Sequence, residues 1–194
     1  MRPARSLRIC LRAALCYFFT EREIARTVAM ETNDINFMQQ ALVAAREAGT
    51  RGEVPVGAVV VSAGEVIGSG HNCREALRSP LGHAEIVAIQ AAASHVGGWR
   101  LNECEIYVTL EPCIMCVGAI LQVRMRRLVF GCLDRKAGAV ESLYRLCEDQ
   151  RLNHQLPVIG GVLAIEAGAI LSEFFTHLRT RKRELKIGER WPSG

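Results

Sequence analysis

Residues 106–130 read IYVTLEPCIMCVGAILQVRMRRLVF, and the order of elements in this segment sets the topology. Residues 106–110 are β-branched, aromatic or aliphatic, which predicts a buried strand. Pro112 suits the first turn of a helix, and the residues after it predict a helix over 113–123. A second short apolar run predicts a strand over 128–130. Strand, helix and strand in this order predict a parallel pair of strands joined by a crossover.

The flanking residues add the rest of a mixed sheet. Residues 56–61 and 65–67 are separated by a short turn and predict a β-hairpin. An amphipathic helix is expected to begin at one of the N-cap residues 32–34 and to end at Gly49. The remaining expected elements are helices over 83–95 and about 164–186, a loop with a short helix over 131–154, and a last strand over 157–159. We therefore expect a three-layer α/β/α sandwich, in which helices cover a mixed five-stranded sheet.

The first 29 residues differ from the rest of the chain. They hold six Arg and two Glu, which accounts for the net charge of +4 and leaves 18 basic and 18 acidic residues over 30–194. A targeting segment has such an Arg-rich composition, but Met30 stands directly before the expected first helix and favours a start codon assigned too early. We expect residues 1–29 to be an N-terminal extension and residues 30–194 to form one domain.

The composition restricts the class of protein. With 49% hydrophobic and 23% charged residues, the chain has no apolar run long enough to cross a bilayer, so we expect no membrane partner. Since residues 30–194 are neutral overall, net charge gives only weak evidence for RNA binding. Most of the eight Cys are scattered singly, which indicates buried thiols and a cytoplasmic location rather than a disulfide scaffold.

Three side chains form a candidate metal site. Cys113 and Cys116 lie one helical turn apart, so their sulfurs can grip one cation, and His83 at the start of another helix supplies a third ligand. Three protein ligands leave one tetrahedral position for water, which is typical of catalytic zinc. We expect one Zn²⁺ per subunit. Glu85, two residues after His83, is placed to act as a catalytic proton shuttle for that water.

Other interpretations exist for each fragment of this pattern. A lone Cys-x-x-Cys is also a redox pair, and Cys in a helix is often only packing. A structural zinc site would need a fourth Cys or His at suitable spacing, which the sequence lacks. Together, His83-Ala84-Glu85 and Pro112-Cys113-Ile114-Met115-Cys116 match the signature of the zinc-dependent nucleobase deaminases.

From about Phe37 to about Arg183 the chain resembles the bacterial tRNA-specific adenosine deaminases. The motifs that carry the resemblance are residues 53–58, 83–86, 107–116, 129–131, 136–139, 152–154 and 172–175. The resemblance implies hydrolytic deamination of adenosine to inosine at the wobble position of a tRNA anticodon, by a homodimer that binds the anticodon loop. We expect the substrate to be arginine tRNA with anticodon ACG. The alternatives are a free-base guanine or cytosine deaminase, and a binding module without activity.

The resemblance also implies a set of RNA-contacting residues. Asn72 would bond the flipped nucleoside, and Asp134 would lie near the adjacent nucleotide, although either could be only a turn or cap residue. Phe174 and Phe175 are expected to divide between the core and an RNA-facing surface. Arg179 belongs to a basic cluster with Arg181, Lys182 and Arg183 that could hold phosphates, and Arg124, Arg126 and Arg127 form a second such cluster. The chain departs from the family at residues 1–29, 132–133 and 176–177.

Overall fold

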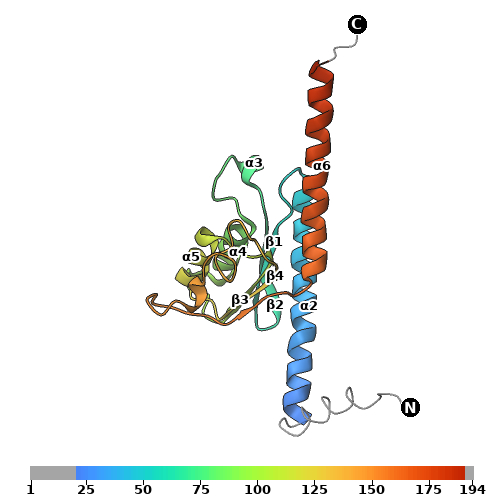
Figure 1. Cartoon of the computed structure of the whole chain (residues 1–194). Helices are drawn as coiled ribbons and strands as arrows, with labels where there is room; N and C mark the ends of the chain where they lie inside the picture. Colours follow the sequence, from blue (N-terminus) through green and yellow to red (C-terminus); the bar gives the residue numbers. More distant parts are fainter. Residues whose placement is uncertain (1–20, 191–194) are drawn as a thin grey trace, which may run out of the picture. The chain divides into compact units, whose positions relative to one another are not determined.

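The computed structural model describes residues 21–190, of which residues up to Asp34 and residues from Ile35 on form two separate units. Figure 1 follows the chain through both units. The expected extension, residues 1–29, has its first 20 residues outside the described part. The domain boundary predicted between residues 29 and 30 falls inside a helix and stays a prediction.

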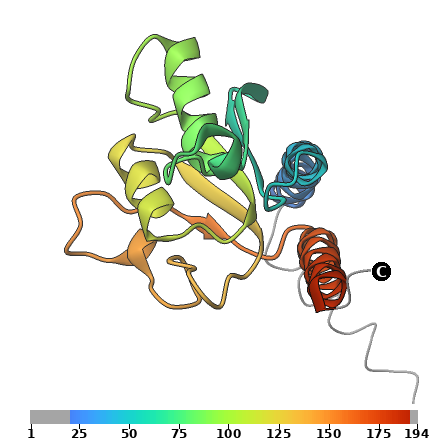
Figure 2. The same cartoon turned by 90° about the horizontal axis from the view of Figure 1, so that it is seen from above.

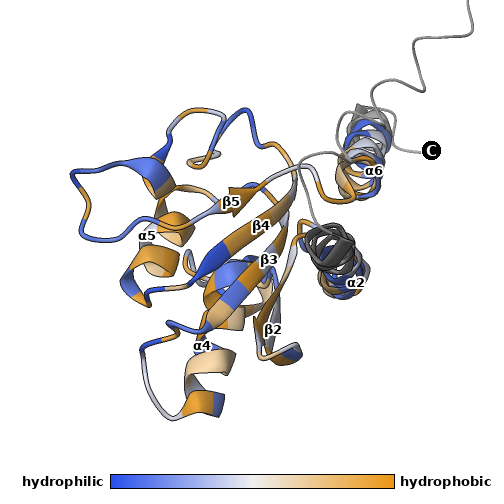
Figure 3. Ribbon diagram, turned by 90° about the horizontal axis from the view of Figure 1, so that it is seen from below, coloured by the Kyte–Doolittle hydropathy of each residue, from blue (hydrophilic) through white to orange (hydrophobic). Residues whose placement is uncertain are grey.

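One sheet of five strands organises the unit that begins at Ile35. Its strands lie in the order β2 (Glu65–His71), β1 (Gly57–Ser62), β3 (Cys104–Leu110), β4 (Arg127–Cys132) and β5 (Val158–Ile159). β1 pairs antiparallel with both β2 and β3, whereas β3, β4 and β5 are parallel. The sheet is therefore mixed, as the hairpin and the crossover predicted, and Figure 3 shows its largely hydrophobic strands.

Helices cover both faces of this sheet. Because side chains alternate along a strand, Val60, Ile106 and Leu128 face α4 (Ala84–Val96) and α5 (Ile114–Gln122) and form the larger core with them. Val59, Tyr107 and Val129 face the opposite side and pack against Met38 and Ala41 of α2 (Glu21–Thr50). α6 (Ala164–Arg190) covers the same side beside β4. Figure 2 shows the three layers, which confirm the α/β/α sandwich.

Three local expectations need correction. The first helix does not begin at residues 32–34, because helix-forming residues continue the turn back to Glu21 without a Pro or Gly to stop it. The short helix expected within 131–154 is a single 3₁₀ turn, η1 (Leu146–Glu148). One short helix, α3 (Arg74–Leu77), was not expected at all. None of these differences alters the sheet.

Gly70 in β2 lets α4 lie close to the sheet beside the candidate site. A Cβ at Gly70 would lie 2.4 Å from the carbonyl oxygen of Ala84 and 2.6 Å from the amide nitrogen of Ala88. No larger residue fits there without moving backbone, so Gly70 allows the first turn of α4 to lie directly against β2. This contact fixes the position of His83 and Glu85, which flank Ala84.

No helix within residues 21–190 is both long and apolar enough to pass through a bilayer.

Candidate metal centre and catalytic pocket

Two helix starts carry the predicted metal ligands. His83 is the N-cap of α4 and Cys113 is the N-cap of α5, both with extended backbone and neither using its side chain as a cap. Cys116 lies in the first turn of α5 and is fully buried. Because α5 follows the C-terminal end of β3, the ligands gather at the sheet edge where α/β folds place their sites.

The three ligand atoms have the spacing of a tetrahedral zinc site. His83 Nδ1 lies 3.5 Å from Cys116 Sγ and 3.7 Å from Cys113 Sγ, and all three atoms fall within 4.8 Å of one another. Zinc bonds of about 2.3 Å to sulfur and about 2.0–2.1 Å to nitrogen place neighbouring ligand atoms about 3.6 Å apart. The side chains therefore fit one zinc ion, with Nδ1 as the nitrogen ligand.

The protonation of the ligands shows that they act as one group. Hydrogen bonds, first from Cys116 and then from His83, lower the pKa of the Cys113 thiol to about 4 against the opposing effect of burial. The hydrogen bond that Cys116 donates to Cys113, together with burial, raises the pKa of Cys116. The hydrogen bond with Cys113 also raises the pKa of His83. The Cys113 sulfur therefore carries negative charge readily, whereas zinc must displace a proton from the Cys116 sulfur.

Glu85 is the buried carboxyl group beside these ligands. It is 4% exposed and lies in the first turn of α4. Burial is the main cause that raises its pKa, and the charge on Cys113 acts in the same direction. A carboxyl group whose pKa lies above its usual range holds a proton more readily, which suits it to accept and return a proton in general acid–base catalysis.

A pocket of about 230 Å³ opens onto these groups. Of the predicted site residues, His83, Glu85, Cys113, Asn72 and Asp134 line it. Sequence reasoning missed several others, which are Val54, Val56, Arg74, Leu110, Glu111 and Ala137. Arg74 could have been found only through α3, because it is the first residue of this unexpected helix and lines the pocket.

Glu111 organises one wall of the pocket. Its carboxylate is 2% exposed and accepts hydrogen bonds from the amides of the loop over 134–142 and from the Ser142 hydroxyl. Burial alone would raise the pKa of Glu111, but these hydrogen bonds outweigh it and hold the pKa below its usual range. The ionised carboxylate therefore fixes the loop that carries Asp134.

Asp134 combines a turn role with a place in the pocket. Its Oδ1 accepts hydrogen bonds from the amides of Lys136 and Ala137, at 2.9 and 3.2 Å, as an Asx turn does. The carboxylate nevertheless lines the pocket. The cap interpretation is thus confirmed for one oxygen, and a contact with substrate stays a prediction.

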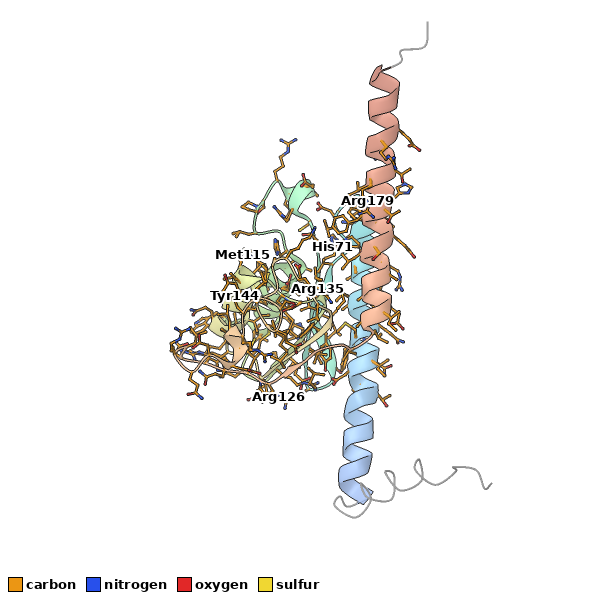
Figure 4. All side chains as sticks on the ribbon, viewed as in Figure 1. His71, Met115, Arg126, Arg135, Tyr144 and Arg179 are labelled. Atoms are coloured by element: carbon orange, nitrogen blue, oxygen red, sulfur yellow. The ribbon has the colours of Figure 1, made fainter. Side chains whose placement is uncertain are left out.

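The residues predicted on the last helix do not reach this pocket. Phe174 is half-buried and Phe175 is 42% exposed, with their rings edge to face at 5.5 Å. Arg179 is exposed and donates a hydrogen bond to Thr176 Oγ1 at 2.9 Å; Figure 4 labels it on α6. In the second basic cluster, Arg126 and Arg127 both pair with the Glu105 carboxylate, whose single negative charge offsets one of their two positive charges.

Comparison with known proteins identifies relatives across most of the chain. Residues 31–132 match the family model of the cytidine and deoxycytidylate deaminase zinc-binding region. Over 152 residues the chain is 44% identical to the tRNA-specific adenosine deaminase of Bacillus subtilis, covering 78% of this chain and 94% of the relative. It is 45% identical over 151 residues to the tRNA-specific adenosine deaminase of Haemophilus influenzae, covering 77% and 87%.

Solved structures agree with these relatives. The structure of a tRNA deaminase studied for A-to-I editing at the wobble position of transfer RNA matches with a TM-score of 0.68 and 45% identity, covering 70% of this chain and 99% of that one. The guanine deaminase of Nitrosomonas europaea matches with a TM-score of 0.61 and 25% identity, covering 72% and 83%.

Proposed function

We propose, since this chain belongs to the tRNA-specific adenosine deaminases within the cytidine and deoxycytidylate deaminase family, that it converts adenosine to inosine at the wobble position of a tRNA anticodon. One observation carries the chemical part of this proposal. The ligand atoms of His83, Cys113 and Cys116 have the spacing of a zinc site, and two of these residues, His83 and Cys113, line the same pocket as the buried Glu85. Only a base that has left its stack can enter such a pocket, as zinc deaminases require.

The residues of the pocket divide the chemical work. His83, Cys113 and Cys116 would hold the zinc ion, which would supply a water activated for attack. Glu85 would accept a proton from the attacking water and donate a proton to the ring nitrogen N1 as C6 of adenine gains the oxygen. It then passes a proton to the amino group, so that the C6–N bond breaks and ammonia leaves. Asn72 and Asp134, which both line the pocket, hold the nucleotide.

The finer proposal is that the substrate is arginine tRNA with anticodon ACG. A base in an anticodon loop is nearly unstacked already, so its extrusion costs less than extrusion from a duplex. Phosphate contacts must come from local clusters, since the chain beyond residue 29 has no net charge. The exposed Arg179, Arg181 and Arg183 on α6 support such a contact, whereas Arg126 and Arg127 share the single negative charge of Glu105.

A panel of substrates tests the proposed function. Purified enzyme is given an anticodon stem-loop with ACG, the same loop with cytidine at the target position, free adenosine, free cytosine and free guanine. We expect inosine from the first substrate and no ammonia from the others. Rapid ammonia release from guanine with the stem-loop untouched would transfer the chain to the free-base deaminases, whose guanine member shares this fold.

We also propose that the enzyme is a homodimer. Large apolar side chains are exposed around the pocket-forming segments, at Leu77 in α3, Ile114 at the start of α5, and Leu143 and Tyr144 after the loop held by Glu111. Exposed apolar surface of this kind favours burial against another subunit. Sedimentation at micromolar concentration decides the oligomeric state.

We propose a cytoplasmic location because the cysteines do not form disulfides in the described part of the chain. All six cysteines in the described part of the chain are free thiols, which suits a reducing compartment. Fractionation of cells that express the protein tests this location.

A further inference from the structure

Glu53 is a buried carboxylate directly behind the wall of the catalytic pocket. It is 2% exposed and follows the end of α2, and its amide donates to the carbonyl of Ala48 at 3.0 Å. Its neighbours Val54 and Val56 line the pocket, whereas Glu53 does not. A carboxylate in such a place does not touch the substrate, and its burial requires partners within the protein.

Both oxygens of this carboxylate have a partner. Oε1 accepts a hydrogen bond from the amide of Ala76 at 2.8 Å, and Oε2 accepts one from the Asn72 side-chain nitrogen Nδ2 at 3.3 Å. The first bond caps α3, whose N-cap residue Cys73 makes no side-chain cap of its own. The second bond links Glu53 to a residue of the pocket wall.

The link to Glu53 determines which end of the Asn72 amide faces the pocket. Both side-chain oxygens of Glu53 accept hydrogen bonds, so the Asn72 amide turns its NH₂ group toward Glu53 and its oxygen Oδ1 away. No hydrogen bond within the described chain uses Oδ1, yet no described side chain contains a fully buried polar atom without a partner. Because Asn72 lines the pocket, Oδ1 is open to it.

We infer that Glu53 is a positioning residue that sets the hydrogen-bond polarity of the pocket, making Asn72 an acceptor for the 2′-hydroxyl of the target nucleotide. This inference rests on the proposed function. The only N–H donors of adenine within an RNA chain are on the amino group that must face the metal ligands. The 3′-oxygen is esterified in the chain, so the 2′-hydroxyl is the one remaining donor of the nucleotide. The arrangement therefore selects RNA over DNA.

Glu53→Gln tests the inference because it is isosteric and should reverse this polarity. The Gln carbonyl can still accept from Ala76, which leaves its NH₂ group facing Asn72. Asn72 must then turn Oδ1 toward Gln and present NH₂ to the pocket. Turnover is measured on three ACG stem-loops whose target adenosine carries a 2′-hydroxyl, a 2′-hydrogen or a 2′-fluorine.

For the unchanged enzyme we expect kcat/KM to fall about tenfold when the 2′-hydroxyl is replaced by hydrogen or fluorine, which is the value of one net hydrogen bond. For Glu53→Gln the hydroxyl-to-hydrogen ratio should approach one, with zinc content and melting temperature close to those of the unchanged enzyme. Asn72→Ala should also bring the ratio to one, and the double variant should add nothing further. Glu75→Gln, an exposed charge change in α3, is the matched control and should keep the tenfold ratio.

Two results separate this inference from the proposed function. If the unchanged enzyme leaves the ribose-containing stem-loop untouched, the proposed function fails and the inference falls with it. If that stem-loop is deaminated but Glu53→Gln or Asn72→Ala keeps the tenfold ratio, the inference is overturned and the proposed function stands. Should Glu53→Gln fail to fold, the ratio measured for Asn72→Ala decides alone.

Discussion

Glu111 and Gly138 lie so close together that a single methyl group could not be placed between them. A Cβ at Gly138 would be 2.3 Å from both Cδ and Oε2 of Glu111, and 2.6 Å from the carbonyl oxygen of Asp134. Gly138 also forms an isolated bridge with Cys113. Through Gly138, the loop that carries Asp134 therefore contacts both the buried Glu111 carboxylate and the predicted metal ligand Cys113.

Gly138→Ala should therefore loosen the loop and the site together. The added methyl group must displace either the Glu111 carboxylate or backbone, at a cost of about 1–3 kcal/mol in the free energy of unfolding. We expect turnover of the stem-loop to fall at least tenfold, since Asp134 and Cys113 move with the loop. Gly168→Ala is the control, because a Cβ there meets nothing within 4 Å. A Gly138→Ala variant with unchanged stability and turnover would contradict this account of the loop.

Zinc content is expected to depend on His83, Cys113 and Cys116 alone. Elemental analysis of purified protein should give one zinc per subunit, and Cys113→Ala combined with Cys116→Ala should abolish it. Cys132→Ser is the matched control, because this half-buried thiol donates to the carbonyl of Thr109 and lies outside the ligand triangle. If the double variant retained its zinc in full, Cys113 and Cys116 would not be the zinc ligands.

Glu85→Gln should separate catalysis from metal binding. The side chain keeps its size while losing the proton that it exchanges, so turnover should fall by about 10²–10⁴-fold. Zinc content and stem-loop affinity should stay unchanged, because Glu85 lies outside the triangle of metal ligands. A loss of less than tenfold in a single-turnover assay would show that another group moves the proton.

These predictions differ in how much the sequence alone could have supplied. The zinc triangle was predictable because each ligand sits in a short motif at a helix start, where local spacing fixes which side chains share a face. The roles of Glu53 and Glu111 were not, because their partners are 19 to 31 residues away along the chain. Only the folded chain shows which buried carboxylate meets which loop. The start of α2 was predicted wrongly for a different reason. Residues 32–34 can cap a helix, but the residues before Thr32 also favour a helix, so α2 continues through this possible cap.

Acid stability should depend on Glu105. Burial raises the pKa of this carboxyl group, but hydrogen bonds from Arg127 and Tyr107 and the charges of Arg127 and Arg126 lower it further, so the net pKa lies below its usual range. A carboxyl group with a lowered folded-state pKa stabilises fully above its unfolded pKa of about 4.3, and this contribution is lost as the pH falls through the folded value.

Glu105→Gln should accordingly lower the free energy of unfolding at pH 7 by about 1.5–3 kcal/mol. The difference from the unchanged protein should shrink as the pH falls below the unfolded pKa of about 4.3 toward the lower folded pKa of Glu105. Urea titrations across pH 3–7 measure both effects, with the exposed Glu103→Gln as the control. A difference that stayed constant with pH would mean that packing, and not charge, explains the effect.

The last prediction concerns α6 and rests on the proposed RNA substrate. Phe175 is 42% exposed, whereas its neighbour Phe174 is half-buried, so Phe175 is the more accessible ring for a base outside the catalytic pocket. Stacking on an aromatic ring contributes about 1–3 kcal/mol per base. Phe175→Ala should therefore raise KM for the stem-loop about tenfold while leaving kcat and the melting temperature unchanged. Phe174→Ala should instead lower the melting temperature, because it removes buried packing. If Phe174→Ala raised KM and Phe175→Ala lowered the melting temperature, the two side chains would have the opposite roles.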